Sequence, residues 1–180
     1  MTRAAKHRVM PTRGDAGGSR GRTVILGCGR WSMGDDQAGL RVAERLRAVL
    51  PSDVSVMADE NPGVALLSAA DPLDHLVIID AAPADDAHPA GTYTVVDRDR
   101  LIETAGEGGS THQVGVRVGL TILAALGTLS RRVSIFALFG RSFRRSLQMS
   151  PEVVAAVEAV AERIVQEVSA SVRGERSCTS

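Results

Sequence analysis

The sequence predicts an α/β fold, a three-layer α/β/α sandwich around a twisted, mainly parallel sheet of about five strands. Short apolar runs rich in β-branched residues alternate along the chain with stretches of helical periodicity, which is the pattern of strand and helix units. Aromatic residues make up only 3% of the composition, and the many small aliphatic residues suit helices packed tightly against a sheet. With 180 residues, of which 44% are hydrophobic, the chain can bury one core.

The elements follow in order from these patterns. A strand is expected over residues 23–28 (TVILGC), followed by a helix over 36–50 whose buried stripe holds Val42, Leu46 and Val49. Further strands are expected over 53–58, 75–81 and 132–140, with a hairpin or edge strand over 91–97. Further helices are expected over 62–70, 112–127 and 151–169, the last with Ser150 as N-cap and Pro151 at the first helical position.

Two polar tails flank a single predicted domain over residues 23–170. Residues 1–22 hold five Arg, one Lys and one Asp, which gives this segment a charge of +5. The rest of the chain balances it, so that the net charge of the protein is zero. This segment has no periodicity and no apolar core of a secretory signal, so we expect a disordered basic tail. It could contact nucleic acid, but an extended start of the chain is the simpler interpretation. Residues 171–180 form a second, polar C-terminal tail.

The composition also indicates where the protein works. No apolar run approaches the roughly 20 residues that span a bilayer, so we expect a soluble protein that does not bind membranes. The two cysteines, Cys28 and Cys178, form neither a disulfide framework nor a metal-binding spacing. These features favour the cytoplasm.

The glycine-rich turn after the first strand, LGCGRWSMGDDQAG, does not fit a nucleotide site. A dinucleotide fingerprint that begins at Gly27 needs glycine at position 32, where this chain has Ser32. A phosphate-binding loop needs Lys and then Ser or Thr after its last glycine, but Asp35 and Asp36 follow Gly34. Carboxylates at a helix start are favoured by the helix dipole and repel phosphate. No nucleotide cofactor is therefore expected.

The two aspartates of this turn are predicted to have different roles. Asp35 is well placed as a structural N-cap that accepts hydrogen bonds from the amides of Gln37 or Ala38. Adjacent helical residues point about 100° apart, so Asp36 is free for another role. It could point across the strand ends, or it could be a solvated acid of the first helical turn.

Two more candidates map to the same edge of the predicted sheet. Asp80 ends the most apolar strand, HLVIIDA, where a carboxylate must be hydrogen-bonded, paired or metal-bound. His112 begins a helix after a glycine segment, where it could also cap or pack. Together with Asp36 these residues form a plausible divalent metal site, and mixed nitrogen and oxygen ligands suit zinc, nickel or iron better than calcium.

Residues 23 to about 169 resemble the hydrogenase maturation proteases. The family's glycine turn, its acidic pair at the first helix, its strand-ending aspartate and its later Ser-x-His-Gln segment appear here in order as GCGR, DDQAG, HLVIIDA and STHQVG. A terminal helix opened by MSPEVV completes the resemblance.

The resemblance implies an endopeptidase that removes a C-terminal extension from the large subunit of a nickel–iron hydrogenase after nickel insertion. The family's metal-contacting residues match Asp36, Asp80 and His112. The nickel is supplied by the substrate, so the expected partner is the large-subunit precursor, and processing activates that enzyme. The family is usually placed with the aspartic-type peptidases. The catalytic base stays open, with Asp36 and Asp80 as candidates.

The chain also departs from the family pattern. Arg30 replaces an Asn of the glycine turn, and MADENPG (57–63) stands where the family commonly has an Asp-Gly-Gly-Thr loop for target recognition. We therefore expect Asp59, Glu60 and Asn61 to recognise the substrate. An alternative is a non-catalytic relative that senses the metal or binds a partner. The basic stretch 140–146 could dock an acidic surface, or it could be a solvated loop.

Overall fold

A computed structural model describes residues 22–68, 73–96, 111–130 and 132–176. Within these ranges the strands are β1 (Thr23–Cys28), β2 (Ser55–Asp59), β3 (His75–Pro83), β4 (Tyr93–Val96) and β5 (Arg132–Gly140). The helical elements are η1 (Gly34–Gln37, a 3-10 turn), α1 (Ala38–Val49), α2 (Pro62–Ser68), α4 (Thr111–Ala125) and α5 (Pro151–Arg176). The predicted tail 1–22, except residue 22, and the predicted element ends at 69–70 and 97 lie outside the described residues.

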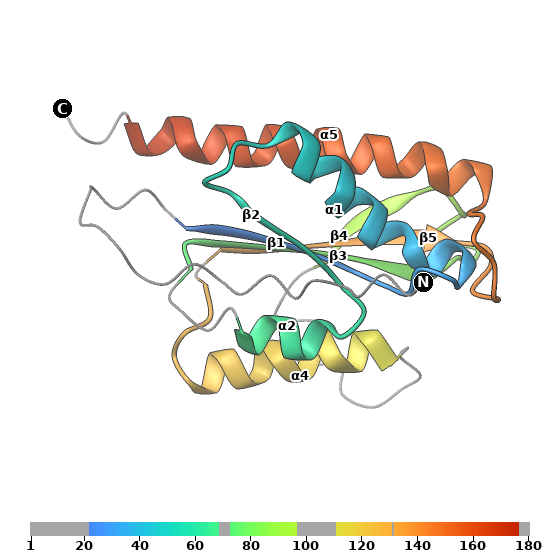
Figure 1. The fold of residues 1–180 in the computed structure, drawn as a ribbon, viewed down its shortest axis with the longest axis horizontal. Helices are drawn as coiled ribbons and strands as arrows, with labels where there is room; N and C mark the ends of the chain where they lie inside the picture. The colour runs from blue at the N-terminus through green and yellow to red at the C-terminus, as the bar shows by residue number, and fades with distance from the viewer. Residues whose placement is uncertain (1–21, 69–72, 97–110, 131, 177–180) are drawn as a thin grey trace, which may run out of the picture.

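The strands form one sheet in the order β2-β1-β3-β5-β4. The first four of these run parallel, and β4 pairs antiparallel with β5 at the edge. Helices α1 and α5 cover one face of the sheet, and α2 and α4 cover the other (Figure 1). This confirms the predicted three-layer sandwich with a mainly parallel sheet of five strands.

The central strand β3 is buried from both sides, which explains its unbroken apolar run. Val77 and Ile79 belong to the core cluster beneath α1 and α5. Leu76 and Ile78 belong to the cluster beneath α2 and α4. Successive side chains of a strand point to opposite faces. The residue after Ile79 therefore faces α2 and α4, which decides how Asp80 is presented.

The predicted helix over 36–50 differs from the structure at both ends. It begins with the 3-10 turn η1, and α1 starts only at Ala38. Val42 and Leu46 are fully buried as expected, but Val49 is 51% exposed, so its predicted place in the core was wrong. The helix ends at Val49 because Leu50 is extended, as is usual for a residue before proline.

The terminal helix α5 runs past its predicted end at residue 169, to Arg176. Val168 is still buried in the core cluster beneath α1 and α5, so the helix is anchored close to this end. No proline stands between residues 169 and 176, and one glycine there costs only about 1 kcal/mol of helix propensity. The first part of the predicted C-terminal tail is thus helical.

No helix in the described ranges is long and apolar enough to cross a membrane.

Candidate active site

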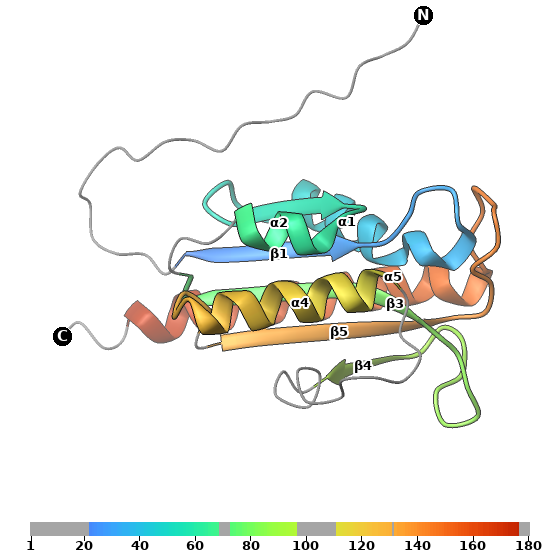
Figure 2. The same cartoon turned by 90° about the horizontal axis from the view of Figure 1, so that it is seen from below.

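The carboxyl edge of the parallel strands brings together the elements that carry the predicted site. Asp36 lies in η1, the next element after β1, and Asp80 lies near the end of β3. His112 is the second residue of α4, a helix that starts at this edge because it runs back toward the start of β5. Figure 2 shows η1 and the start of α4 at the end of the sheet to which the arrowhead of β1 points. The side chain of His112 lies outside the described part of the structure.

A contact between two glycines holds the start of α4 in place. A Cβ atom added at Gly63 would lie 3.0 Å from the carbonyl oxygen of Gly115, so the starts of α2 and α4 approach more closely than larger residues allow. Gly115 follows His112 by less than one helical turn. The first turn of α4, which includes His112, therefore packs close to the start of α2.

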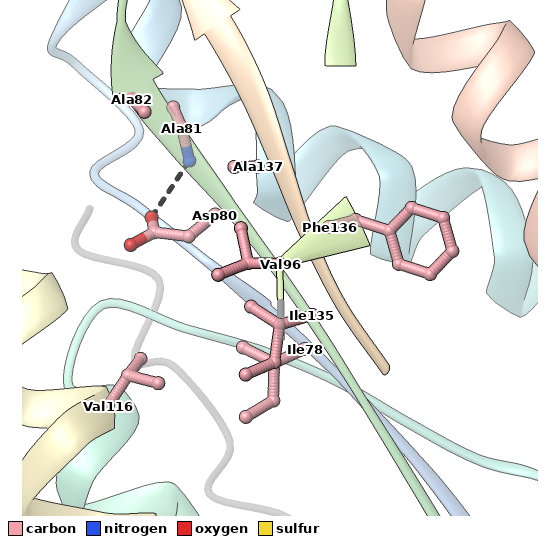
Figure 3. A pocket seen from close by; sticks show the side chains of 9 residues that line it. All are labelled: Ile78, Asp80, Ala81, Ala82, Val96, Val116, Ile135, Phe136 and Ala137. Carbon is pink, nitrogen blue, oxygen red and sulfur yellow. Dashed lines mark hydrogen bonds between the residues drawn. The ribbon is translucent and has the colours of Figure 1, made fainter. Parts of the chain in front are cut away.

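Asp80 points to the face of the sheet that α2 and α4 cover. It continues the alternation of Leu76 and Ile78, which lie in the core cluster on that face. Figure 3 shows its carboxyl group on the side of Ile78 and Val116, while the ring of Phe136 lies on the opposite side of the sheet. A carboxyl group therefore stands where the strand pattern would otherwise place an apolar side chain.

The hydrogen bonding of Asp80 is incomplete. Its Oδ1 accepts a bond from the amide of Ala81 at 2.9 Å, and its buried Oδ2 has no hydrogen-bond partner among the described residues. Burial, opposed by the hydrogen bond from the Ala81 amide and assisted by the charge of Asp36, raises the pKa of Asp80 to about 7. A carboxyl group with such a pKa can both accept and donate a proton near neutral pH.

A pocket of about 60 Å³ adjoins Asp80, which is room for more than one water molecule. Its lining consists of Ile78, Asp80, Ala81, Ala82, Val96, Val116, Ile135, Phe136 and Ala137 (Figure 3). Asp80 is the only ionisable residue among these nine. An apolar pocket with one polar group is the usual environment of a reactive carboxyl.

Asp36 is buried, and it is paired with a residue that lies six positions earlier. The guanidinium Nε of Arg30 donates to Oδ2 of Asp36 at 2.6 Å. The side chain of Asp36 is 3% exposed, whereas that of Arg30 is 42% exposed. Asp36 is therefore not a solvated acid of the first turn, and it lies near enough to Asp80 to affect its pKa.

The predicted N-cap role of Asp35 was wrong. Neither η1 nor α1 has a side-chain cap, and Asp35 is fully buried within η1. Its carboxylate accepts bonds from the amides of Arg141, Ser142 and Ser150 and from the hydroxyl of Ser150, at 2.6 to 2.9 Å. Burial alone would raise the pKa of Asp35, but these bonds outweigh it and hold the pKa below its usual value. The carboxylate thus fastens the loop after β5 to η1.

The 3-10 geometry of η1 explains why adjacent aspartates have different environments. With about three residues per turn, successive side chains point roughly 120° apart. Asp35 points to the loop that joins β5 and α5, and Asp36 points to Arg30 in the loop after β1.

The predicted recognition loop uses two of its side chains for internal contacts. Oδ1 of Asp59 accepts a bond from the amide of Asn61 at 2.7 Å, which closes a tight turn. Oε1 of Glu60 accepts a bond from the amide of Trp31 at 2.9 Å, so this loop is joined to the loop after β1. Glu60 and Asn61 are exposed and could still contact a partner.

Cys28 is the last residue of β1 and not part of the turn that follows. It is fully buried, pairs in register with Asp59, and donates weakly to the carbonyl of Leu26. Burial raises the pKa of its thiol well above the usual value, and the nearby charges of Asp80 and Asp59 add to this. The thiol stays protonated, so Cys28 packs against the core and is no nucleophile.

Among the described residues, no group of three His, Cys, Asp or Glu side chains is arranged to hold a metal ion. The pair of Asp36 and Asp80 accounts for two of the three predicted ligands, and the third belongs to the side chain that is not described. Arg30 is the partner of Asp36 that the motif did not predict. Its pairing with Asp36 across a glycine turn has no local sequence signal.

Comparison with known proteins assigns the chain to a family. Residues 40–167 match the family described as hydrogenase maturation protease. The chain belongs to this family. Within the family, it is 26% identical over 146 residues to the hydrogenase 2 maturation protease of Escherichia coli K12, covering 80% of this chain and 88% of that protein.

Solved structures of the family share the fold. The hydrogenase maturating endopeptidase HybD from E. coli superposes with a TM-score of 0.74 at 25% identity, covering 83% of this chain and 93% of that one. The [NiFe] hydrogenase maturation protease HycI from Thermococcus kodakarensis KOD1 superposes with a TM-score of 0.67 at 26% identity, with the same coverages. The α/β sandwich of this hydrogenase maturation protease is thus that of its relatives.

Proposed function

We propose that this protein is an endopeptidase that removes the C-terminal extension of a nickel–iron hydrogenase large-subunit precursor after nickel has been inserted. Its membership in the hydrogenase maturation protease family supports the reaction class. The single observation that carries the proposal is the buried Oδ2 of Asp80, which lacks a hydrogen-bond partner among the described residues and lies at the carboxyl edge near Asp36. A buried carboxyl group that lacks a hydrogen-bond partner destabilises the protein, unless a bound substrate supplies that partner.

The precursor's nickel is the group that we propose completes this site. Two carboxylates and one imidazole are ligands that a nickel ion accepts, and Asp36, Asp80 and His112 supply them. The metal arrives with the substrate, so the enzyme needs neither a resident cofactor nor a nucleotide. Reading the metal restricts cleavage to a precursor that has been loaded.

Of the two candidate acids, Asp80 is better suited to the chemistry of an aspartic-type peptidase. As a general base it would take a proton from water while the water oxygen attacks the carbonyl carbon of the scissile bond. It would then return the proton to the amide nitrogen as the carbon–nitrogen bond breaks. Asp36 is then assigned to contact with the metal and not to proton transfer; its buried carboxylate lies beside the guanidinium of Arg30 in the free protein.

The proposed partner is the large-subunit precursor, which we expect to meet the enzyme in the cytoplasm. Asp59 is the last residue of β2, and Glu60 and Asn61 follow it at the same edge as Asp80, so a peptide bound there can contact them. Neither nucleic acid nor a membrane is part of the proposed reaction.

Three contacts within the protein favour a second candidate, a relative that binds the metal-loaded partner without cutting it. Arg30 occupies Asp36, and the side chains of Asp59 and Glu60 are engaged in contacts within the protein. In such a module the site would sense nickel, and the precursor would keep its extension.

The two candidates differ in the mass of the large subunit. Purified precursor, loaded or not loaded with nickel, is incubated with the wild-type protein and with Asp36→Asn, Asp80→Asn and His112→Ala. We expect the wild type to shorten only the loaded precursor and the three variants to leave it intact. Glu158→Gln removes an exposed carboxylate on α5 and is the matched control that should process normally.

Binding of the loaded precursor without any change in its mass would favour the non-catalytic candidate. Equal cleavage of loaded and unloaded precursor, or cleavage that survives the loss of His112, would show that this protein does not read nickel.

A further inference from the structure

The acid proposed to contact nickel already holds a cation in the free protein. The guanidinium of Arg30 binds Oδ2 of Asp36 at 2.6 Å. Of this pair the carboxylate is almost entirely buried, while the arginine side chain is 42% exposed. The carboxylate of Asp36 is thus held inside the protein, whereas the long side chain of Arg30 is partly in solvent and can move away from it.

The loop after β1 is built to place Arg30 over Asp36. The amide of Trp31 is bound by Glu60 at 2.9 Å, and the carbonyl of Ser32 accepts a bond from the amide of Ser146 at 2.9 Å. Gly29 has a φ of 141° and lies against the carbonyl of Asp36, where a Cβ atom would collide. The backbone on both sides of Arg30 is therefore fixed, which distinguishes this pair from an ordinary surface ion pair.

Electrostatics gives this placement a consequence for metal binding. The turn η1, which holds Asp36, packs against β3, which holds Asp80, so the two carboxyl groups lie at the same edge of the sheet. Two neighbouring carboxylates attract divalent cations from solution, and the guanidinium offsets part of that attraction. Removing the positive charge of Arg30 makes the edge more attractive to any free divalent ion.

We propose that Arg30 is a specificity-determining residue, which keeps Asp36 closed to free divalent cations until nickel held by the substrate displaces its guanidinium. The inference rests on the proposed function, since it takes Asp36 to be a contact of the substrate's nickel. It adds a step that the metal-contacting residues alone do not supply: the free enzyme is protected from metal that arrives without the precursor.

Calorimetric titration of the metal-free, untagged full chain with nickel chloride tests this proposal. Arg30→Gln should bind free nickel about tenfold more tightly than the wild type. Arg30→Lys keeps the charge and should stay near the wild type. Arg45→Gln is the matched control, because it removes the same charge from an exposed ion pair between Arg45 on α1 and Glu158 on α5. It should leave the affinity unchanged.

A double-mutant cycle assigns the effect to Asp36. Asp36→Asn should change the affinity of the wild type for free nickel little, because Arg30 already occupies that acid. In the Arg30→Gln background the same substitution should remove the tenfold gain. The first of these measurements needs no Arg30 variant, so it is decisive even if Arg30→Gln does not fold.

Equal nickel affinity of a folded Arg30→Gln and the wild type would overturn the inference, as would a large loss on Asp36→Asn in the wild type. These results are distinct from failure of the proposed function. That failure would appear as cleavage of nickel-free precursor, or as no cleavage at all, by the wild-type protein.

Discussion

Asp35 and Asp80 are both buried carboxyl groups at the carboxyl edge of the same sheet, but their surroundings are opposite. Asp35, in the turn after β1, accepts four hydrogen bonds from the loop between β5 and α5. Among the described residues, Asp80, near the end of β3, accepts one bond, from its own neighbour Ala81. The pKa of Asp35 is held below its usual value by these bonds, whereas that of Asp80 is raised to about 7 by burial.

The difference shows how one edge of a sheet separates structural from chemical roles. A buried carboxylate that is fully hydrogen-bonded stabilises the fold and has little capacity left for a ligand. A buried carboxyl with an unused oxygen destabilises the free protein, and it is ready for a proton, a metal or a substrate. Asp36 is intermediate in this respect: its carboxylate has a partner, but that partner, Arg30, is partly exposed.

The largest effect is expected for Asp80→Asn on processing. The amide cannot take a proton from water, so cleavage of the nickel-loaded precursor should fall by about 10² to 10³-fold. The fold should remain intact, because no described side chain depends on Asp80 for a hydrogen bond. Mass spectrometry of the precursor measures the cleavage rate, and circular dichroism checks the fold. A variant that folds and cleaves at the wild-type rate would remove Asp80 from the chemistry.

Asp35→Asn should act on stability instead. An N-cap aspartate tolerates asparagine well, but here the new NH₂ group would face amide donors of Arg141, Ser142 or Ser150. We expect the free energy of unfolding to fall by about 3 kcal/mol. Urea denaturation at pH 7 measures this, with Glu158→Gln as the exposed control. A loss below about 0.5 kcal/mol would mean that the loop after β5 does not depend on Asp35.

The fold was predictable because its signals are local. The run HLVIIDA is apolar at every position from Leu76 to Ile79, as expected for a strand buried on both faces, and Pro151 marks the start of α5. Strand and helix alternation then predicts the parallel sheet and its reactive edge. Val49 failed as a core residue because periodicity does not tell where a helix leaves the sheet that it covers.

The site was predictable in its positions and not in its contacts. Asp36 and Asp80 were predicted to lie at the carboxyl edge of the sheet, where strand ends and helix starts meet, and the structure places both there. The partners of Asp35 lie more than 100 residues away in the sequence, and an N-cap was the only local role available to it. Arg30 could be noted as a departure from the family, but its contact with Asp36 depends on how the glycine turn folds.

The pH dependence of stability should separate the two aspartates in a chelator-containing buffer. The pKa of Asp80 rises from 3.8 to about 7 on folding, so the native state retains a proton that the unfolded state loses. Stability from this proton is present at low pH and is lost as pH rises through 7. Relative to Asp80→Asn, the wild type should lose about 2 kcal/mol between pH 5 and pH 8.

Asp35 should show no such change over the same range. Its pKa is lowered on folding, so its contribution is complete above its unfolded pKa and falls only as pH drops through the still lower folded value. The deficit of Asp35→Asn should therefore be constant from pH 5 to pH 8. Urea denaturation of the wild type and both variants at the two pH values gives the comparison, and parallel pH profiles of all three proteins would contradict it.

The smallest effect is expected for Glu60→Gln, which tests a carboxylate that has an internal partner but is exposed. The amide oxygen of glutamine can keep the bond to Trp31, so the melting temperature should change by less than about 2 °C. If the negative charge of this loop helps to recognise the precursor, KM should rise about threefold while kcat is unchanged. Steady-state processing assays with Glu158→Gln as control measure both constants. A fall in kcat with KM unchanged would instead show that Glu60 affects the reacting groups, through Trp31 and Arg30. The loop after β2 would then have a chemical role, as Asp80 does, and not a role in recognition.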